Sequence, residues 1–144
     1  MRTLDDMFFG SAAAVSETPA PRNRVLIIDD DAEVRSVYQE LLVAAKFDVV
    51  TASGGAEGLS MLRQDPKIGL VLLDLMMPEM DGWRFRHAQR SDARLEKIPT
   101  VIVSGTPLRD IVHAELQAAD YLLKPVGRDH LISVVAAYCK PRND

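Results

Sequence analysis

The stretch VLLDLMMPEMDG, residues 71–82, contains the transition on which the fold depends. It completes an apolar run, IGLVLLD at residues 68–74, that ends in a single carboxylate, Asp74. A strand that is apolar on both faces is typical of a parallel sheet covered by helices on both sides. The chain then turns through Met-Met-Pro and reaches Asp81-Gly82. This stretch therefore predicts a buried strand that stops at an acid and is followed by a turn.

Four further strand-length apolar runs accompany this one along the chain. They are RVLII at residues 24–28, FDVVTA at 47–52, TVIVS at 100–104 and DYLLK at 120–124. Helical patterns alternate with these runs, the third at residues 82–90, the fourth at 109–119 and the last after Pro125. Strands that alternate with helices predict an α/β domain with a doubly wound, five-stranded parallel sheet and helices on both faces.

Three of the helical patterns show an apolar face at helical spacing. The faces comprise Val34, Val37, Tyr38, Leu41, Leu42 and Ala45, then Ala56, Leu59 and Leu62, and finally Leu131, Val134, Val135 and Tyr138. Asp30 and Glu33 have the spacing of a capping box at the start of the first of these helices. We expect all three faces to pack against the sheet.

Composition and charge limit the possible functions. A chain of 144 residues suits one domain, and a net charge of -4 gives no reason to expect a nucleic-acid partner. Because Cys139 is the only cysteine, an internal disulfide is excluded and a reducing, cytoplasmic location is expected. No apolar run approaches the length of a membrane span, so membrane insertion is not expected.

The chain divides into an arm at residues 1–23, a domain at 24–140 and a short tail at 141–144. The arm is rich in Ala, Ser and Pro and lacks a period, which favours a flexible segment. A secretion signal is disfavoured because Asp5 and Asp6 stand where such signals carry positive charge. A docking patch in the arm remains an alternative, and it would be formed by Leu4, Met7, Phe8 and Phe9.

Chemically reactive side chains follow the predicted strands. The carboxyl ends of the strands in a doubly wound sheet lie at one edge of the sheet, where ligands bind. The polar residues at these ends are Asp29, Asp30, Asp31, Asp74, Ser104 and Lys124. Crowded carboxylates repel one another unless a cation lies between them, and hard oxygen ligands suit Mg²⁺ together with phosphate oxygens. Asp74 could then attack phosphorus, with Lys124 neutralising charge and Ser104 donating a hydrogen bond. Each residue alone has a plainer interpretation, such as a helix cap or a solvated lysine.

The set of motifs resembles the receiver domain of two-component response regulators, of the single-domain, chemotaxis-regulator type. The matching motifs are VLIIDDDAEVR, VLLDLMMPEMDGW, PTVIVSGT and DYLLKP, which together span about residues 24–140. The resemblance implies a flavodoxin-like fold with Asp74 as phosphoacceptor. It also implies Mg²⁺ bound by Asp30 directly, by Asp29 through water, by Asp74, and by the backbone carbonyl of Met76.

The resemblance assigns four more residues. Ser104 and Lys124 would bind the phosphoryl group, and Tyr121 would rotate inward as the hydroxyl of Ser104 moves. The Lys124–Pro125 peptide bond would be cis, which is uncommon for an arbitrary bond before proline. Ala118 stands where the family usually has a glycine at the end of the fourth helix, and it would be strained if left-handed.

The resemblance predicts a stand-alone signalling protein that is not an enzyme beyond catalysing its own phosphorylation and dephosphorylation. Its phosphoryl donor would be a histidine kinase or a histidine phosphotransfer protein. The protein target would bind the face made by helix four, strand five and helix five. One alternative is a phosphohydrolase resembling the haloacid dehalogenase superfamily with Asp29 as nucleophile, although Glu33 replaces its expected Thr. A second alternative is a binding module that never takes phosphate.

Several other residues could suggest a metal site or a basic patch, but the sequence does not support either. His87, His113 and His130 lack metal-ligand spacing, and we expect them at the surface. The arginines of the third helical region are expected on a solvated face; they are Arg84, Arg86, Arg90 and Arg94. Trp83 either packs against the third helix or lies near the site, and the sequence does not decide between these positions.

Overall fold

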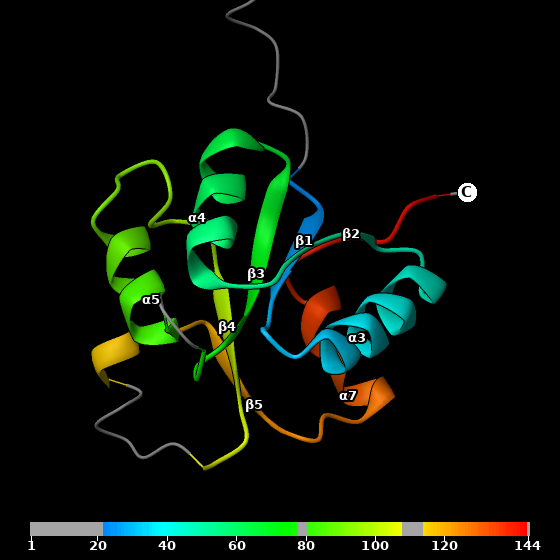
Figure 1. Cartoon of the computed structure of the whole chain (residues 1–144). Helices are drawn as coiled ribbons and strands as arrows, with labels where there is room; N and C mark the ends of the chain where they lie inside the picture. Colours follow the sequence, from blue (N-terminus) through cyan, green and yellow to red (C-terminus); the bar gives the residue numbers. More distant parts are fainter. Residues whose placement is uncertain (1–21, 78–80, 108–113, 144) are drawn as a thin grey trace, which may run out of the picture.

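The computed structural model describes residues 22–77, 81–107 and 114–143, and these form a single parallel sheet with helices on both sides (Figure 1). The strands are β1 (Arg24–Ile28), β2 (Asp48–Ala52), β3 (Ile68–Asp74), β4 (Thr100–Ser104) and β5 (Asp120–Leu123). Their order is β2-β1-β3-β4-β5, and every neighbouring pair is parallel. The predicted α/β class and doubly wound sheet are confirmed.

Within the part of the chain that the structure describes, four helices cover the sheet, two on each face (Figure 1). They are α3 (Ala32–Ala44), α4 (Gly55–Gln64), α5 (Gly82–Arg90) and α7 (Arg128–Ala136). Of the helix predicted at 109–119, residues 109–113 lie outside the described part, and residues 114–116 are helical. Among the described residues, no helix has both the length and the apolar character to cross a membrane.

The central strand β3 explains why both faces are covered. Its seven residues are all buried, and its side chains alternate between two apolar clusters. Val71 and Leu73 pack with α4 and α5, whereas Leu70 and Leu72 pack with α3 and α7. Each fully buried leucine or valine contributes about 1.5–3 kcal/mol relative to an exposed one. This burial holds the end of β3, and therefore Asp74, in a fixed position.

Three details of the helices differ from expectation. Val37 is 51% exposed and Ala56 is also exposed, because the sheet covers a narrower stripe of each helix than the sequence pattern suggests. The N-cap of α3 is Asp31 rather than Asp30, and its carboxylate accepts hydrogen bonds from the backbone N–H groups of Glu33 and Val34. The side chain of Asp30 is therefore not used as the cap.

Arg86 was expected on a solvated face, and that expectation is wrong. Its side chain is 7% exposed and donates to the carbonyl oxygens of Leu116 and Gln117, at 2.8 and 2.6 Å, and to Gln89 Oε1 at 2.8 Å. Gln89, fully buried, donates in turn to the carbonyl of Ile98 at 2.9 Å. The guanidinium can be buried because all three of these donors find oxygen acceptors.

A second arginine of α5 reinforces the same contact. Arg90 donates to the carbonyl of Glu115 at 3.0 Å and to Gln117 Oε1 at 2.7 Å. The residue with a left-handed backbone here is Gln117, with φ of 48°, and not Ala118, so the strain considered for alanine does not arise. The end of the helical turn at residues 114–116 is thus held by α5.

Candidate functional site

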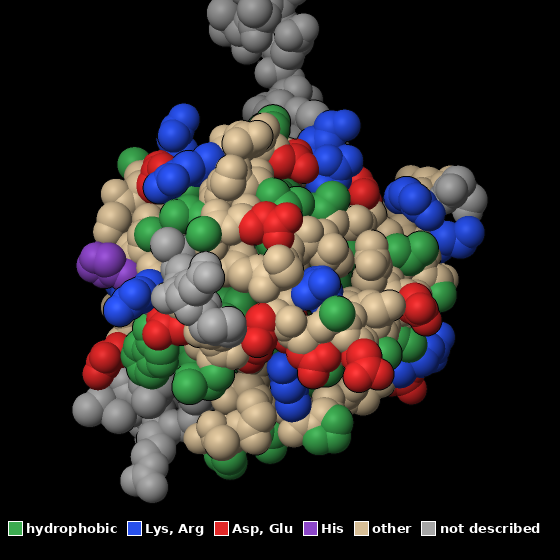
Figure 2. Space-filling view, viewed as in Figure 1, with side chains coloured by type: hydrophobic (Ala, Val, Ile, Leu, Met, Phe, Trp, Pro, Cys, Tyr) green, Lys and Arg blue, Asp and Glu red, His purple; other side chains and the backbone are tan. Residues whose placement is uncertain are grey.

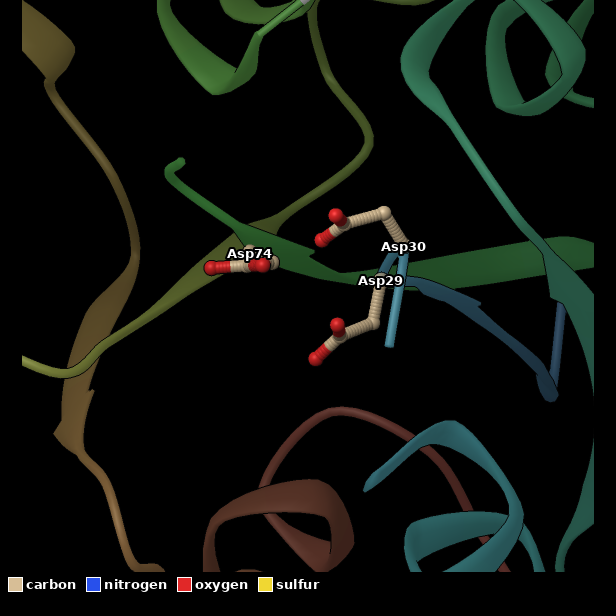
Figure 3. A group of neighbouring side chains, drawn as sticks. All are labelled: Asp29, Asp30 and Asp74. Carbon is tan, nitrogen blue, oxygen red and sulfur yellow. The ribbon is translucent and has the colours of Figure 1, made fainter. Parts of the chain in front are cut away.

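Two adjacent parallel strands bring three carboxylates together. Ile28 of β1 is paired with Leu73 of β3, so the residues that follow them emerge at the same edge of the sheet. Carboxylate oxygens of Asp29, Asp30 and Asp74 all lie within 4.8 Å of one another. Figure 3 shows Asp29 and Asp30 extending from the end of β1 toward the side where Asp74 lies. The sequence-predicted acids are therefore one cluster.

Asp29 is held most firmly of the three. It is 2% exposed, and its Oδ1 accepts a hydrogen bond from the backbone N–H of Asp31 at 2.9 Å. Its Oδ2 accepts one from Lys124 Nζ at 3.0 Å. Arg35, a residue that the sequence pattern did not single out, donates to the backbone carbonyl of Asp29 at 2.6 Å. Both carboxylate oxygens of Asp29 are thus already engaged.

Lys124 supplies the positive charge at the cluster. Its Nζ lies 3.0 Å from Asp29 Oδ2 and 3.7 Å from Asp74 Oδ1. Burial lowers the pKa of Lys124, but the hydrogen bond and charge of Asp29 and the charge of Asp74 outweigh burial and raise it. Lys124 is therefore charged at neutral pH. The peptide bond from Lys124 to Pro125 is cis, as the resemblance implies.

Asp74 is the most perturbed acid of the site. It is 8% exposed, and burial, followed by the charge of Asp29, raises its pKa from 3.8 to about 6. The charge of Lys124 and a weak hydrogen bond from the Met76 N–H, at 3.4 Å, offset part of this rise. One ammonium group among three carboxylates leaves negative charge uncompensated when all are ionised. The donor set, all carboxylate oxygen, fits a hard divalent cation such as Mg²⁺.

The turn after β3 places glycine against the backbone of the site. The Gly82 N–H donates to the carbonyl of Leu75 at 2.8 Å. A Cβ atom at Gly82 would lie 2.7 Å from Leu75 Cα and 2.8 Å from the carbonyl oxygen of Asp74, which is closer than real Cβ contacts. Only glycine fits where α5 begins. Met76, between these residues, has a side chain that is 71% exposed, and residues 78–80 lie outside the described part.

Ser104 lies at the end of β4 with its hydroxyl engaged in its own loop. The side chain is buried, and Oγ donates to the carbonyl of Thr106 at 2.9 Å and accepts from the Thr106 N–H at 3.2 Å. Tyr121 is half-buried beside the cluster that α4 and α5 cover, and its hydroxyl accepts from the Ala118 N–H at 3.3 Å. Ser104 therefore lies at the expected end of β4, whereas Tyr121 lies near the start of β5, and the bonds of Ser104 lie within its loop.

The remaining candidates are the histidines and Trp83. His87 and His130 are exposed as expected, whereas His113 lies outside the described residues. Trp83 is half-buried and packs against the apolar cluster of α4 and α5.

A groove adjoins the site on the side of α3. It has a volume of about 580 Å³ and a mostly apolar lining. The lining residues are Asp31, Glu33, Val34, Val37, Tyr38, Lys124, Pro125 and Val126. The exposure of Val37 is explained by its place in this groove. Sequence periodicity could not reveal the groove, because it joins α3 to the loop after β5.

Comparison with known proteins supports one family. The sequence model of the response regulator receiver domain matches residues 25–136. Two-component response regulator ORR3 of rice (Oryza sativa subsp. indica) is 34% identical over 110 residues, covering 75% of this chain and 84% of the relative. Transcriptional regulatory protein CpxR of Escherichia coli is 35% identical over 117 residues, covering 80% of this chain but 48% of CpxR.

A solved structure agrees with these sequence matches. The receiver domain protein (CheY-like) of Methanospirillum hungatei is 33% identical with a TM-score of 0.70, covering 81% of this chain and 93% of that one. The parallel sheet, the acid cluster at its edge and the family match therefore lead to one conclusion. The chain belongs to the response regulator receiver domain family.

Proposed function

We propose that this protein accepts a phosphoryl group on Asp74 and passes the signal to another protein by direct binding. The observation that carries the proposal is the cluster of Asp29, Asp30 and Asp74 with Lys124 against it. Asp74 is the best placed nucleophile, since Asp29 already accepts a hydrogen bond on each carboxylate oxygen. In this reading the protein catalyses only its own phosphorylation and dephosphorylation.

Mg²⁺ would be held by Asp30, by Asp74, by the backbone carbonyl of Met76 and, through water, by Asp29. When bound, it supplies positive charge that neutralises the carboxylates and the phosphoryl oxygens. Three carboxylates with a single ammonium partner fit such an ion, because without it burial and then the charge of Asp29 raise the pKa of Asp74. The raised pKa makes the Asp74 carboxylate a stronger base.

The transfer itself is a displacement at phosphorus. An oxygen of Asp74 forms the new P–O bond while the P–N bond of a phosphohistidine breaks, and the released imidazole nitrogen keeps the electron pair and later takes a proton. The donor is a histidine kinase or a histidine phosphotransfer protein. The groove between α3 and the loop after β5 is the surface next to Lys124 on which such a donor would rest.

The phosphoryl group then alters the rim of the sheet. Lys124 pairs with its oxygens, and Ser104 exchanges its bond to the Thr106 carbonyl for one to the phosphoryl group. Tyr121 turns inward as the loop after β4 moves. The resulting surface, made by the segment before β5, by β5 and by α7, binds the protein target. We place the protein in the cytoplasm, where it meets its phosphoryl donor.

Two alternative functions are compatible with parts of the sequence. The phosphohydrolase with Asp29 as nucleophile is not supported, because the matched family is the receiver domain and Asp29 is engaged on both oxygens. The module that only binds, without taking phosphate, differs from the proposal in one measurable respect. It predicts that no covalent phosphate is found on the protein.

Intact-mass measurement after incubation with acetyl phosphate and Mg²⁺ tests the proposal. The expected result is one added phosphoryl group that alkali or hydroxylamine removes and that Asp74→Asn does not acquire. Asp129→Asn serves as the matched control, since its exposed carboxylate on α7 faces solvent. Labelling that survives Asp74→Asn but is lost in Asp29→Asn would contradict the proposal, as would the absence of any adduct with every donor tried, including a phosphotransfer protein.

A further inference from the structure

A second groove lies at the opposite end of the sheet, where the strands begin. It consists of two adjoining hollows of about 320 and 180 Å³, both lined by Arg22, Arg94 and Ile98. The further lining residues are Leu62, Arg63, Pro66, Gly69, Leu95, Lys97 and Pro99. We call this the basal groove. The phosphorylation site proposed above uses none of its residues.

The basal groove combines an apolar floor with a basic rim. Leu62, Leu95 and Ile98 form buried parts of its lining. No acidic side chain lines either hollow among the described residues, although Asp92 pairs nearby with Arg63, at 3.9 Å, and with Arg94, at 3.6 Å. Figure 2 shows basic side chains along the upper edge of the molecule, with apolar and acidic ones between them. The groove is therefore suited to an apolar segment that carries acids.

The chain itself provides such a segment and begins the domain at this groove. Arg22 lines both hollows, and its backbone packs so closely on Gly69 that any side chain there would collide with it. The sequence LDDMFF at residues 4–9 contains Leu4, Met7 and two phenylalanines around Asp5-Asp6. Its apolar side chains match the apolar floor of the groove, and its two acids match the basic rim.

The connecting chain is long enough for this contact. Residues 10–21 separate the segment from Arg22, and twelve residues span at most about 40 Å. A tether of this length holds its end at an effective concentration on the order of millimolar near the attachment point. Weak contacts therefore suffice for docking, and solvent-exposed ion pairs of the kind that Arg94 makes add only about 0–1 kcal/mol each. Most of the binding comes from the apolar surface that Phe8 and Phe9 remove from water, since Leu62, Leu95 and Ile98 are already buried.

We propose that residues 4–9 of this chain dock in the basal groove, with Phe8 and Phe9 on its apolar floor and Asp5 and Asp6 toward its basic rim. The contact is intramolecular and lies at the end of the sheet away from Asp74. Docking covers the apolar floor and leaves the acid cluster accessible to a phosphoryl donor. The proposal does not depend on which residue accepts phosphate.

Paramagnetic relaxation in the full chain tests this contact. Ser11→Cys provides a site for a nitroxide label, while Cys139 stays unlabelled because it is 1% exposed and burial raises its pKa to about 11. The expected result is loss of amide signal at Gly69, Leu95 and Ile98 that returns when the label is reduced. Amides of β5 should keep their intensity, since they lie on another part of the fold.

Two sets of variants make the result specific. Adding Phe8→Ser and Phe9→Ser to the labelled chain should restore the groove signals, and so should Arg94→Glu with Lys97→Glu. Arg128→Glu, equally exposed but at the start of α7 after β5, should leave them weakened. Signals that stay intact in the labelled wild-type background overturn the proposal. A loss that appears only when labelled chains are mixed with isotopically enriched, unlabelled ones also overturns it, because a second copy is then the occupant.

Discussion

The ionisation of Asp74 should destabilise the metal-free protein at neutral pH. Burial, then the charge of Asp29, raises the pKa of this carboxyl from 3.8 to about 6. A raised pKa means that the folded state binds the proton more tightly than the unfolded state. The resulting stability is fully present below about pH 4 and is lost as pH rises through about 6. Asp74→Asn, which stays neutral, should avoid this loss.

The size of the effect follows from the pKa difference. At about 1.4 kcal/mol for each pKa unit, charging Asp74 in the fold costs at most about 3 kcal/mol. Solvent near the edge of the sheet screens part of this, so we expect Asp74→Asn to raise the free energy of unfolding by about 1–3 kcal/mol at pH 7.5. At pH 4 the variant and the wild type should be nearly equal, because the folded wild type is then protonated at Asp74.

Urea denaturation in the presence of a chelator, between pH 4 and pH 8, measures this difference. Asp129→Asn is the control, and its stability should follow that of the wild type throughout. Mg²⁺ should then stabilise the wild type and should stabilise Asp74→Asn much less. A variant that is no more stable than the wild type at pH 7.5, or a gain that is the same at every pH, would refute the reasoning.

Two further predictions concern the turn after β3. Gly82→Ala should destabilise the protein by about 2 kcal/mol or more, because its Cβ meets backbone that cannot move aside, whereas Gly105→Ala, with open space around it, should change the urea midpoint little. Met76→Asn should speed loss of the phosphoryl group, followed by intact mass after donor removal, because the amide can hydrogen-bond an attacking water and the thioether cannot. Equal lifetimes in Met76→Asn and wild type would argue against that role.

Strand positions could be predicted from the sequence because a short apolar run is recognised from neighbouring residues alone. Residues 24–28, 68–74 and 100–104 were expected as strands and are strands in the structure. The same local information brought Asp29, Asp30 and Asp74 to one edge, since parallel strands end together. Whether Asp30 or Asp31 caps the helix depends on the local backbone conformation, which a spacing pattern does not specify.

The burial of polar side chains could not be predicted from the sequence. Arg86 lies in a run of basic residues, GWRFRHAQR, that by composition indicates a solvated face. It is buried because carbonyl groups some thirty residues further along the chain are aimed at it, and such acceptors are invisible to a helical period. Val37 shows the converse, since an apolar residue at a core spacing lies open in a groove formed with a distant loop.

Helix α5 contacts both the acid cluster and the segment just before β5. Its first residue, Gly82, packs against the backbone of Asp74 and Leu75. Arg86 and Arg90 donate hydrogen bonds to backbone carbonyl groups just before β5. A helix of nine residues, about 13 Å long, therefore spans from the acid cluster to the carbonyl groups just before β5. We expect a tilt of α5 at its first residue to shift the segment before β5 without a change in the sheet between them.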